Sequence, residues 1–169
     1  LQSLFFFENI TTPIMIPLTS LNRRYDMKEM IYSGNGITEL LSIEWFNDGT
    51  AYAVVNVRGS HPCAYIQFPG IEKIKSYDDV FINEDEDDDF WIHGGFTFLG
   101  TYKNMGLPGI WLGWDYAHCG DWTQSYPIAE DRFSHEDEKK WTTEEVVDHA
   151  KKALDYIRQG KYEICSEED

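Results

Sequence analysis

Residues 40–57 constrain the fold most, because they have the pattern of a β-hairpin. Two apolar, β-branched runs, LLSIEWF and TAYAVVNV, flank a turn made of Asn47, Asp48 and Gly49. A turn that carries Asp-Gly between two such runs is a strong signal for a pair of antiparallel strands. The next run, CAYIQF at residues 63–68, alternates well enough to predict a third strand.

Two further strands and a helix are predicted in the second half of the chain. The runs IHGGFTFLG (92–100) and IWLGWDYA (110–117) have strand character, and their internal glycines indicate bulges or close backbone approach. At 142–160, Thr142 and Glu145 have the spacing of a capping box, and apolar residues follow at helical spacing. The predicted fold class is α+β, with a bent antiparallel sheet of about five strands packed against a C-terminal helix.

The chain divides into an N-terminal extension, a single domain and a short tail. Residues 1–39 have no clear period, residues 40–160 hold the predicted elements as one α+β domain, and residues 161–169 form an acidic tail. Within the domain, residues 71–81 predict a loop with a helical turn. The acidic run EDEDDD at 84–89 predicts a solvated connector, because six adjacent carboxylates repel one another.

One feature of the N-terminal extension concerns where translation starts and not how the chain folds. Arg23 and Arg24 stand just upstream of Met27, and a tandem AGG-AGG codon pair at that point would act as a bacterial ribosome-binding site. This suggests that Met27 is the natural start of the protein and that residues 1–26 are a translated leader.

Charge and cysteine usage exclude several classes of function. A net charge of −16 and a sequence pI of about 4.5 disfavour binding to nucleic acid or to an anionic membrane, because the surface repels phosphates. The three cysteines form no CxxC pair, so neither a disulfide framework nor a zinc ribbon is indicated. The apolar patches near the N-terminus lack a basic region before them and are too short to span a bilayer. We expect a cytoplasmic protein.

The reactive side chains gather at residues 111–122, WLGWDYAHCGDW. Asp115, His118 and Asp121 fall on the turn after a predicted strand, and the neighbouring strand would carry His93 beside them. Two imidazoles and two carboxylates can hold a divalent metal or perform acid–base chemistry. The same groups can also fix a tight turn by bonding its main chain. The spacing matches no standard metal motif, so structure, ligand binding and catalysis all stay open.

Strand alternation places two tryptophans of this segment on opposite faces of the predicted strand. Trp111 falls on the same face as Asp115, where its ring could stack on a ligand, and Trp114 falls on the opposite face, in the core. Cys119 follows His118 directly, but adjacent side chains point apart and no third group is placed to orient them. A cysteine nucleophile is therefore disfavoured.

Four motifs carry a resemblance to a known family. CAYIQFP, SYDDV, WIHGGFTFLG and WLGWDYAHCGDW resemble, in the same order, the CGYVxVP, YDD, VHGGLTF and WWxGFDCAHxGD pattern of an uncharacterised family of small bacteriophage and prophage proteins. The likeness covers about residues 56–157, and it implies a phage or prophage accessory protein acting in the bacterial cytoplasm. The matching motif positions are Tyr77, Asp78, Asp79, His93, Gly94, Gly95, Asp115, His118 and Asp121.

These observations favour a non-catalytic binding protein, because no recognisable catalytic spacing is present. The resemblance to small phage proteins implies that it antagonises a host defence by binding a small polar or nucleotide-like ligand, or a host protein. Arg58, Lys103 and Arg132 could contact a phosphate. Two alternatives remain: a metal-dependent hydrolase, and an acidic mimic of nucleic acid. The ligand-binding residues predicted are Tyr77, Asp79, His93, Gly94, Gly95, Trp111, Asp115, His118 and Asp121, and the metal-ligand candidates are His93, Asp115, His118 and Asp121.

Overall fold

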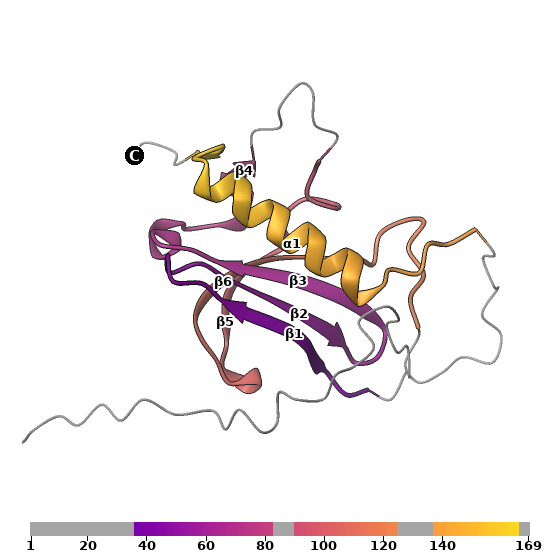
Figure 1. The fold of residues 1–169 in the computed structure, drawn as a ribbon. Helices are drawn as coiled ribbons and strands as arrows, with labels where there is room; N and C mark the ends of the chain where they lie inside the picture. The colour runs from indigo at the N-terminus through magenta and orange to yellow at the C-terminus, as the bar shows by residue number, and fades with distance from the viewer. Residues whose placement is uncertain (1–35, 83–89, 125–136, 166–169) are drawn as a thin grey trace, which may run out of the picture.

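The structure, a computed structural model, describes residues 36–82, 90–124 and 137–165 (Figure 1). Three sequence predictions lie outside these residues. They are the start at Met27 with its leader, the solvated connector at 84–89, and the acidic end of the chain at 166–169.

Five strands form one antiparallel sheet with the order β1-β2-β3-β6-β5. Helix α1 (Thr143–Arg158) runs along one face of this sheet (Figure 1). The predicted α+β fold, with a sheet packed on a C-terminal helix, is confirmed. The strands are β1 (Glu39–Trp45), β2 (Ala51–Val57), β3 (His61–Gln67), β5 (Phe98–Tyr102) and β6 (Leu107–Asp115).

The predicted hairpin is β1 and β2, and its turn is held by the Asp48 side chain. Oδ1 of Asp48 accepts hydrogen bonds from the main-chain N–H and the hydroxyl of Thr50, at 3.0 and 2.7 Å. Gly49 adopts φ 82°, in the left-handed region that favours glycine. The turn residues therefore favour the pairing of the two strands locally, and Arg158 of α1 adds hydrogen bonds to Asp48 and Thr50, each at 2.8 Å.

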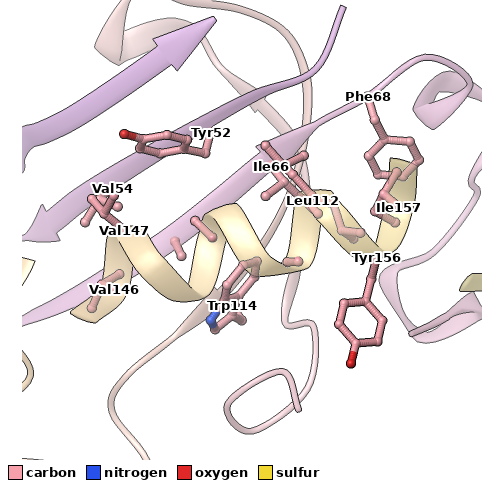
Figure 2. Close-up of a cluster of buried hydrophobic side chains, with 14 of the residues drawn as sticks. Tyr52, Val54, Ile66, Phe68, Leu112, Trp114, Val146, Val147, Tyr156 and Ile157 are labelled. Atoms are coloured by element: carbon pink, nitrogen blue, oxygen red, sulfur yellow. The ribbon is translucent and has the colours of Figure 1, made fainter. Parts of the chain in front are cut away.

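Helix α1 begins and ends where the sequence predicts. Thr142 and Glu145 complete a reciprocal capping box, which satisfies main-chain N–H groups that have no partner inside the helix. The apolar stripe of the helix meets one face of the sheet, and Figure 2 shows Val146, Val147 and Ile157 of α1 facing strand residues such as Ile66. This contact forms the larger of two buried clusters.

The opposite face of the sheet is also apolar. Ala53, Tyr65 and Trp111 belong to a second buried cluster, and the ring of Trp45 lies edge-on to that of Trp111 with centroids 5.5 Å apart. Gly113 of β6 faces Tyr65 so closely that a Cβ would lie 2.4 Å from its ring. The glycine that the sequence pattern associated with close approach thus allows Tyr65 to lie against β6.

One prediction about a strand needs correction. Residues 92–97 are a turn and an extended segment rather than part of a strand, and β5 begins only at Phe98. The reason is that Gly94 and Gly95 adopt φ 69° and 81°, and the Gly95 N–H bonds the Ile92 carbonyl at 2.9 Å, which closes a turn. That turn brings the loop toward the end of β6.

A second, two-stranded sheet was missed by the sequence analysis. Strand β4 (Val80–Ile82) pairs antiparallel with β7 (Tyr162–Ile164), which falls in the stretch predicted as an acidic tail. Three-residue strands give too short a pattern to recognise, and their pairing joins parts of the chain about eighty residues apart. Before β4, the predicted helical turn is present as two 3-10 turns, η2 (Ile71–Lys73) and η3 (Tyr77–Asp79).

Candidate functional site

The two imidazoles and two carboxylates meet where β6 ends. Asp115 is the last residue of β6, His118 and Asp121 follow on the next turn, and His93 comes from the loop before β5. We call these four residues the His/Asp cluster. Their meeting was predicted from the sequence, and the distances between the side chains confirm it. The four residues nevertheless form two pairs of different character.

Asp121 and His93 form a tight, buried pair. Nε2 of His93 lies 2.6 Å from Oδ2 of Asp121, and the side chains are 11% and 4% exposed. Oδ2 also accepts the main-chain N–H of His118 at 2.9 Å, and Oδ1 accepts the indole N–H of Trp141 at 2.7 Å. Three donors thus converge on one carboxylate, which satisfies both of its oxygens. Because the ionised carboxylate of Asp121 only accepts hydrogen bonds, Nε2 of His93 is the donor in this contact.

The pKa of Asp121 reflects this arrangement. Burial raises the pKa, but the hydrogen bonds from His93, from Trp141 and from the main chain of His118 outweigh burial and hold it below its ordinary value. Asp121 is therefore ionised at neutral pH and serves as a fixed acceptor.

Aromatic rings set the position of His93. Its ring stacks on Tyr116 with centroids 4.8 Å apart and planes 8° from parallel, and Trp141 lies edge-on at 5.0 Å. Trp91 lies 5.1 Å away on the loop itself. Because rings and carboxylate fix the imidazole together, the loop that carries His93 is held in place without a ligand.

His118 and Asp115 form a looser pair near the surface. Nδ1 of His118 lies 3.8 Å from Oδ1 of Asp115 and 3.8 Å from Oδ2 of Asp121, and the His118 and Asp115 side chains are 35% and 28% exposed. A separation of 3.8 Å is too long for a hydrogen bond. Asp115 instead accepts bonds from the Thr97 hydroxyl at 3.0 Å and from the main-chain N–H of Ala117 at 3.1 Å.

Both imidazoles keep unused hydrogen-bonding capacity. Among the described residues, Nδ1 of His93 and Nδ1 of His118 are buried and have no hydrogen-bond partner. A buried polar atom without a partner is costly, so these two nitrogens are natural contacts for a ligand, a water molecule or an ion.

Gly94 brings His118 into contact with the loop. A Cβ at Gly94 would lie 2.1 Å from both Cε1 and Nε2 of the His118 ring, and φ at this residue is 69°. No other residue type fits this space in this conformation. Gly95 has φ 81° but open space where a Cβ would lie, so the two neighbouring glycines have different reasons to be glycine.

A hollow lies on the other side of this loop. Its volume is about 630 Å³, in the range of small-molecule sites. One wall is η3 with β4 and the other is the loop that carries His93, so the YDD and HGG segments singled out from the sequence line the same space. We call it the aromatic hollow; it is lined by Tyr77, Asp78, Val80, Phe81, Ile82, Trp91, Ile92, Gly94, Gly95 and Phe96.

Of the predicted ligand residues, Tyr77, Gly94 and Gly95 line the hollow, and the four residues of the His/Asp cluster do not. Trp111 is fully buried in the second cluster beneath Trp45, so the prediction that it stacks on a ligand is wrong. Alternation identified its face correctly, but that face is covered. Asp79 accepts the Ser76 N–H at 3.1 Å as part of a capping box and does not line the hollow, whereas Tyr77 does.

Several residues around the site were missed by sequence reasoning. Trp91 and Phe81 are large apolar side chains that remain 51% and 54% exposed, and both line the hollow. Trp141 and Tyr116 hold the buried pair. Trp91 had a signal, since it directly precedes the IHGG motif. Trp141 lies far along the chain from the cluster and gave none.

The same cluster is the one group among the described residues that could hold a metal ion. One ligand atom each from His93, His118 and Asp121 lie within 4.8 Å of one another. Asp115, the fourth metal-ligand candidate, is not part of this set. The 2.6 Å contact between Nε2 of His93 and Asp121 is a hydrogen bond. An ion would therefore bind here only if this hydrogen bond opened, or if the ion bound Nδ1 of His93 instead.

Compared with protein-family models, curated proteins and solved structures, the chain matches none. Among the described helices, none combines the length and the apolar character needed to cross a membrane. The functional proposal therefore depends on the geometry of the His/Asp cluster and the aromatic hollow.

Proposed function

We propose that this protein is a non-catalytic binding protein whose small ligand occupies the aromatic hollow. The observation that carries the proposal is that two segments distant in the chain, residues 77–82 and 91–96, line one space of about 630 Å³. The second of these segments is fixed from behind by the contact between His93 and Asp121. A preformed concave site of this size, with aromatic and a few polar groups, is the usual form of a small-molecule site.

The His/Asp cluster supports binding more than catalysis. Asp121 already accepts three hydrogen bonds, and a carboxylate engaged in this way orients its neighbours rather than taking up protons. Cys119 is exposed, and no described contact joins it to an activating group, so the sequence argument against a cysteine nucleophile still applies. The His/Asp cluster does not line the hollow; its part in the proposed function is to hold the loop that forms one wall.

The resemblance to small phage and prophage proteins suggests a setting for this binding. We propose that the protein acts in the bacterial cytoplasm as an accessory protein that antagonises a host defence by sequestering its ligand. A rigid preformed site suits sequestration, because little conformational entropy is lost when the ligand binds.

The test is a binding screen with a defined set of amino acids, amines, sugars, nucleosides and nucleoside monophosphates. Thermal shift selects compounds that raise the Tm, and amide chemical shifts locate their site. At least one compound should perturb residues 77–82 and 91–96, and Phe81→Ala should weaken its binding. Ile164→Ala is the matched control, because Ile164 is an exposed apolar residue of the same small sheet that does not line the hollow. Binding of no compound, or shifts confined to another region, overturns the proposal.

A second candidate is a metal-dependent hydrolase, favoured by the closeness of His93, His118 and Asp121. An ion held there would supply a Lewis acid and an activated water, and the chain's own contribution would be to hold the imidazoles through Asp121. Titration with Zn²⁺ and with Mn²⁺ decides this point. One equivalent of tightly bound ion, lost in His118→Gln, supports the metal site, and the absence of stoichiometric binding removes it.

A further inference from the structure

From the lining of the aromatic hollow we infer that its ligand carries an organic cation, an ammonium or methylated ammonium group. This inference rests on the proposed binding function and names the chemical class of the ligand. It departs from the nucleotide-like ligand that the sequence suggested.

Aromatic side chains come from both walls of the hollow. Tyr77 and Phe81 belong to η3 and β4, and Trp91 and Phe96 belong to the loop that carries His93. The face of an aromatic ring is negative, and a cation over it is attracted, most strongly by tryptophan. Several rings around one space are the arrangement with which proteins enclose ammonium groups.

Three of these rings are unusually exposed. Tyr77, Phe81 and Trp91 are 36%, 54% and 51% exposed, whereas Trp111 and Trp114 of β6 are buried at 0% and 1%. Large apolar side chains gathered at the surface mark sites that a partner covers. Here they border a hollow, so the covering group is one that enters it.

The charge of the lining has one sign. Among the described residues, Asp78 is the only charged one that lines the hollow, and no described Lys or Arg lines it. The whole chain carries a net charge of −16, which raises the local concentration of cations and lowers that of anions. A carboxylate beside aromatic rings therefore complements an ammonium group in both charge and shape.

A phosphate is disfavoured by the same lining. Arg58 and Lys103, predicted from the sequence as phosphate contacts, are not among the residues that line the hollow, and Arg132 lies outside the described residues. The Gly95 N–H is engaged by the Ile92 carbonyl and is not free to bind an anion. A phosphate entering the hollow would meet Asp78 without a compensating side-chain cation from the lining.

The experiment compares choline with 3,3-dimethyl-1-butanol, which has the same shape but a neutral carbon in place of the nitrogen. Both are titrated into the full chain in phosphate buffer free of amines, and binding is followed by amide chemical shifts of residues 77–82 and 91–96. Choline should bind, and the neutral isostere should bind about tenfold more weakly or worse, because it lacks the cation–π attraction.

Two pairs of variants attribute this difference to the hollow. Trp91→Leu should abolish the preference for choline, while Trp45→Leu, which removes a tryptophan of similar exposure outside the hollow, should keep it. Asp78→Asn should weaken choline about two- to fivefold, as expected for an exposed carboxylate, while Asp148→Asn on α1 makes the same charge change and should have no effect.

Each outcome bears on a different claim. Equal binding of choline and its isostere, or a preference that survives Trp91→Leu, overturns the cation inference. If neutral or anionic compounds of the wider screen bind in the hollow and choline does not, the cation inference fails and the binding function stands. If no compound binds there, both fail.

Discussion

The His/Asp cluster contains two histidine–aspartate pairs of the same chemistry and opposite environment. His93 and Asp121 are 2.6 Å apart and almost fully buried, and His118 and Asp115 are 3.8 Å apart and about one-third exposed. The first pair joins the loop before β5 to the turn after β6 and to Trp141. The second pair also touches that loop, through Thr97 and Gly94, but no hydrogen bond joins its two side chains to each other. Residue type thus selects the possible chemistry of both pairs. Burial and the number of hydrogen-bond donors decide which pair supports the fold and which pair stays available to other groups.

The largest effect is expected from breaking the buried pair. Asp121→Ala removes the acceptor of three hydrogen bonds and leaves the donors of His93, Trp141 and His118 without a partner. We expect a loss of about 3–5 kcal/mol in the free energy of unfolding, because each buried donor left without a partner costs about 1–3 kcal/mol. Urea unfolding followed by tryptophan fluorescence measures it. A loss below about 1 kcal/mol would contradict the supporting role of Asp121.

The next effect concerns the contact between the loop and His118. Gly94→Ala places a Cβ 2.1 Å from the imidazole in a left-handed backbone, so the ring or the loop must move, and we expect a loss of about 1–3 kcal/mol. Gly95→Ala is the matched control, since it meets no atom within 4 Å and has only the backbone strain of about 1 kcal/mol. Urea unfolding of both variants gives the comparison; equal losses would show that His118 does not need the space.

The third effect is a dependence of the free energy of unfolding on pH, which we expect from His149. The Tyr116 hydroxyl accepts the Trp114 indole N–H at 3.1 Å and shares a hydrogen bond with Nδ1 of His149 at 3.0 Å. Burial lowers the pKa of His149, and the unfolded chain takes up the proton first. Stability is therefore complete above about pH 6.5, the unfolded pKa, and is lost as pH falls through the folded value.

Unfolding in urea at several pH values checks this dependence. The slope for one such group is at most about 1.4 kcal/mol per pH unit, and His149→Gln should reduce it. His61, whose pKa is also lowered by burial, contributes in the same direction, so His61→Gln is the companion variant. A slope unchanged in both variants would contradict the assignment.

The smallest effect on stability is expected at the exposed pair. Asp115→Ala removes bonds to Thr97 and Ala117 at a partly exposed position, and we expect a loss below about 1 kcal/mol. Measured beside Asp121→Ala under the same conditions, this variant sharpens the contrast between the pairs. A loss as large as that of Asp121→Ala would show that both pairs support the fold.

Local interactions explain which parts of the fold were predictable. The β1–β2 hairpin and α1 each contain their own turn or cap, so that Asp48, Gly49, Thr142 and Glu145 act within a few residues of sequence. The meeting of the four cluster residues was also predictable, because adjacent antiparallel strands bring their loops together. The division of that cluster into a supporting and an available pair was not, because it depends on Trp141, which comes from just before α1.

The sequence by itself determined the α+β architecture, the hairpin, the capped helix and the set of four polar side chains, because periodicity and turn chemistry act over short distances. Only the tertiary structure decided that Trp111 is covered and that β5 begins at Phe98, after the turn closed by Gly94 and Gly95. It also decided that Tyr77, Phe81 and Trp91 border one hollow. These outcomes depend on which surfaces are covered by distant parts of the chain, and burial of that kind leaves no local pattern in the sequence.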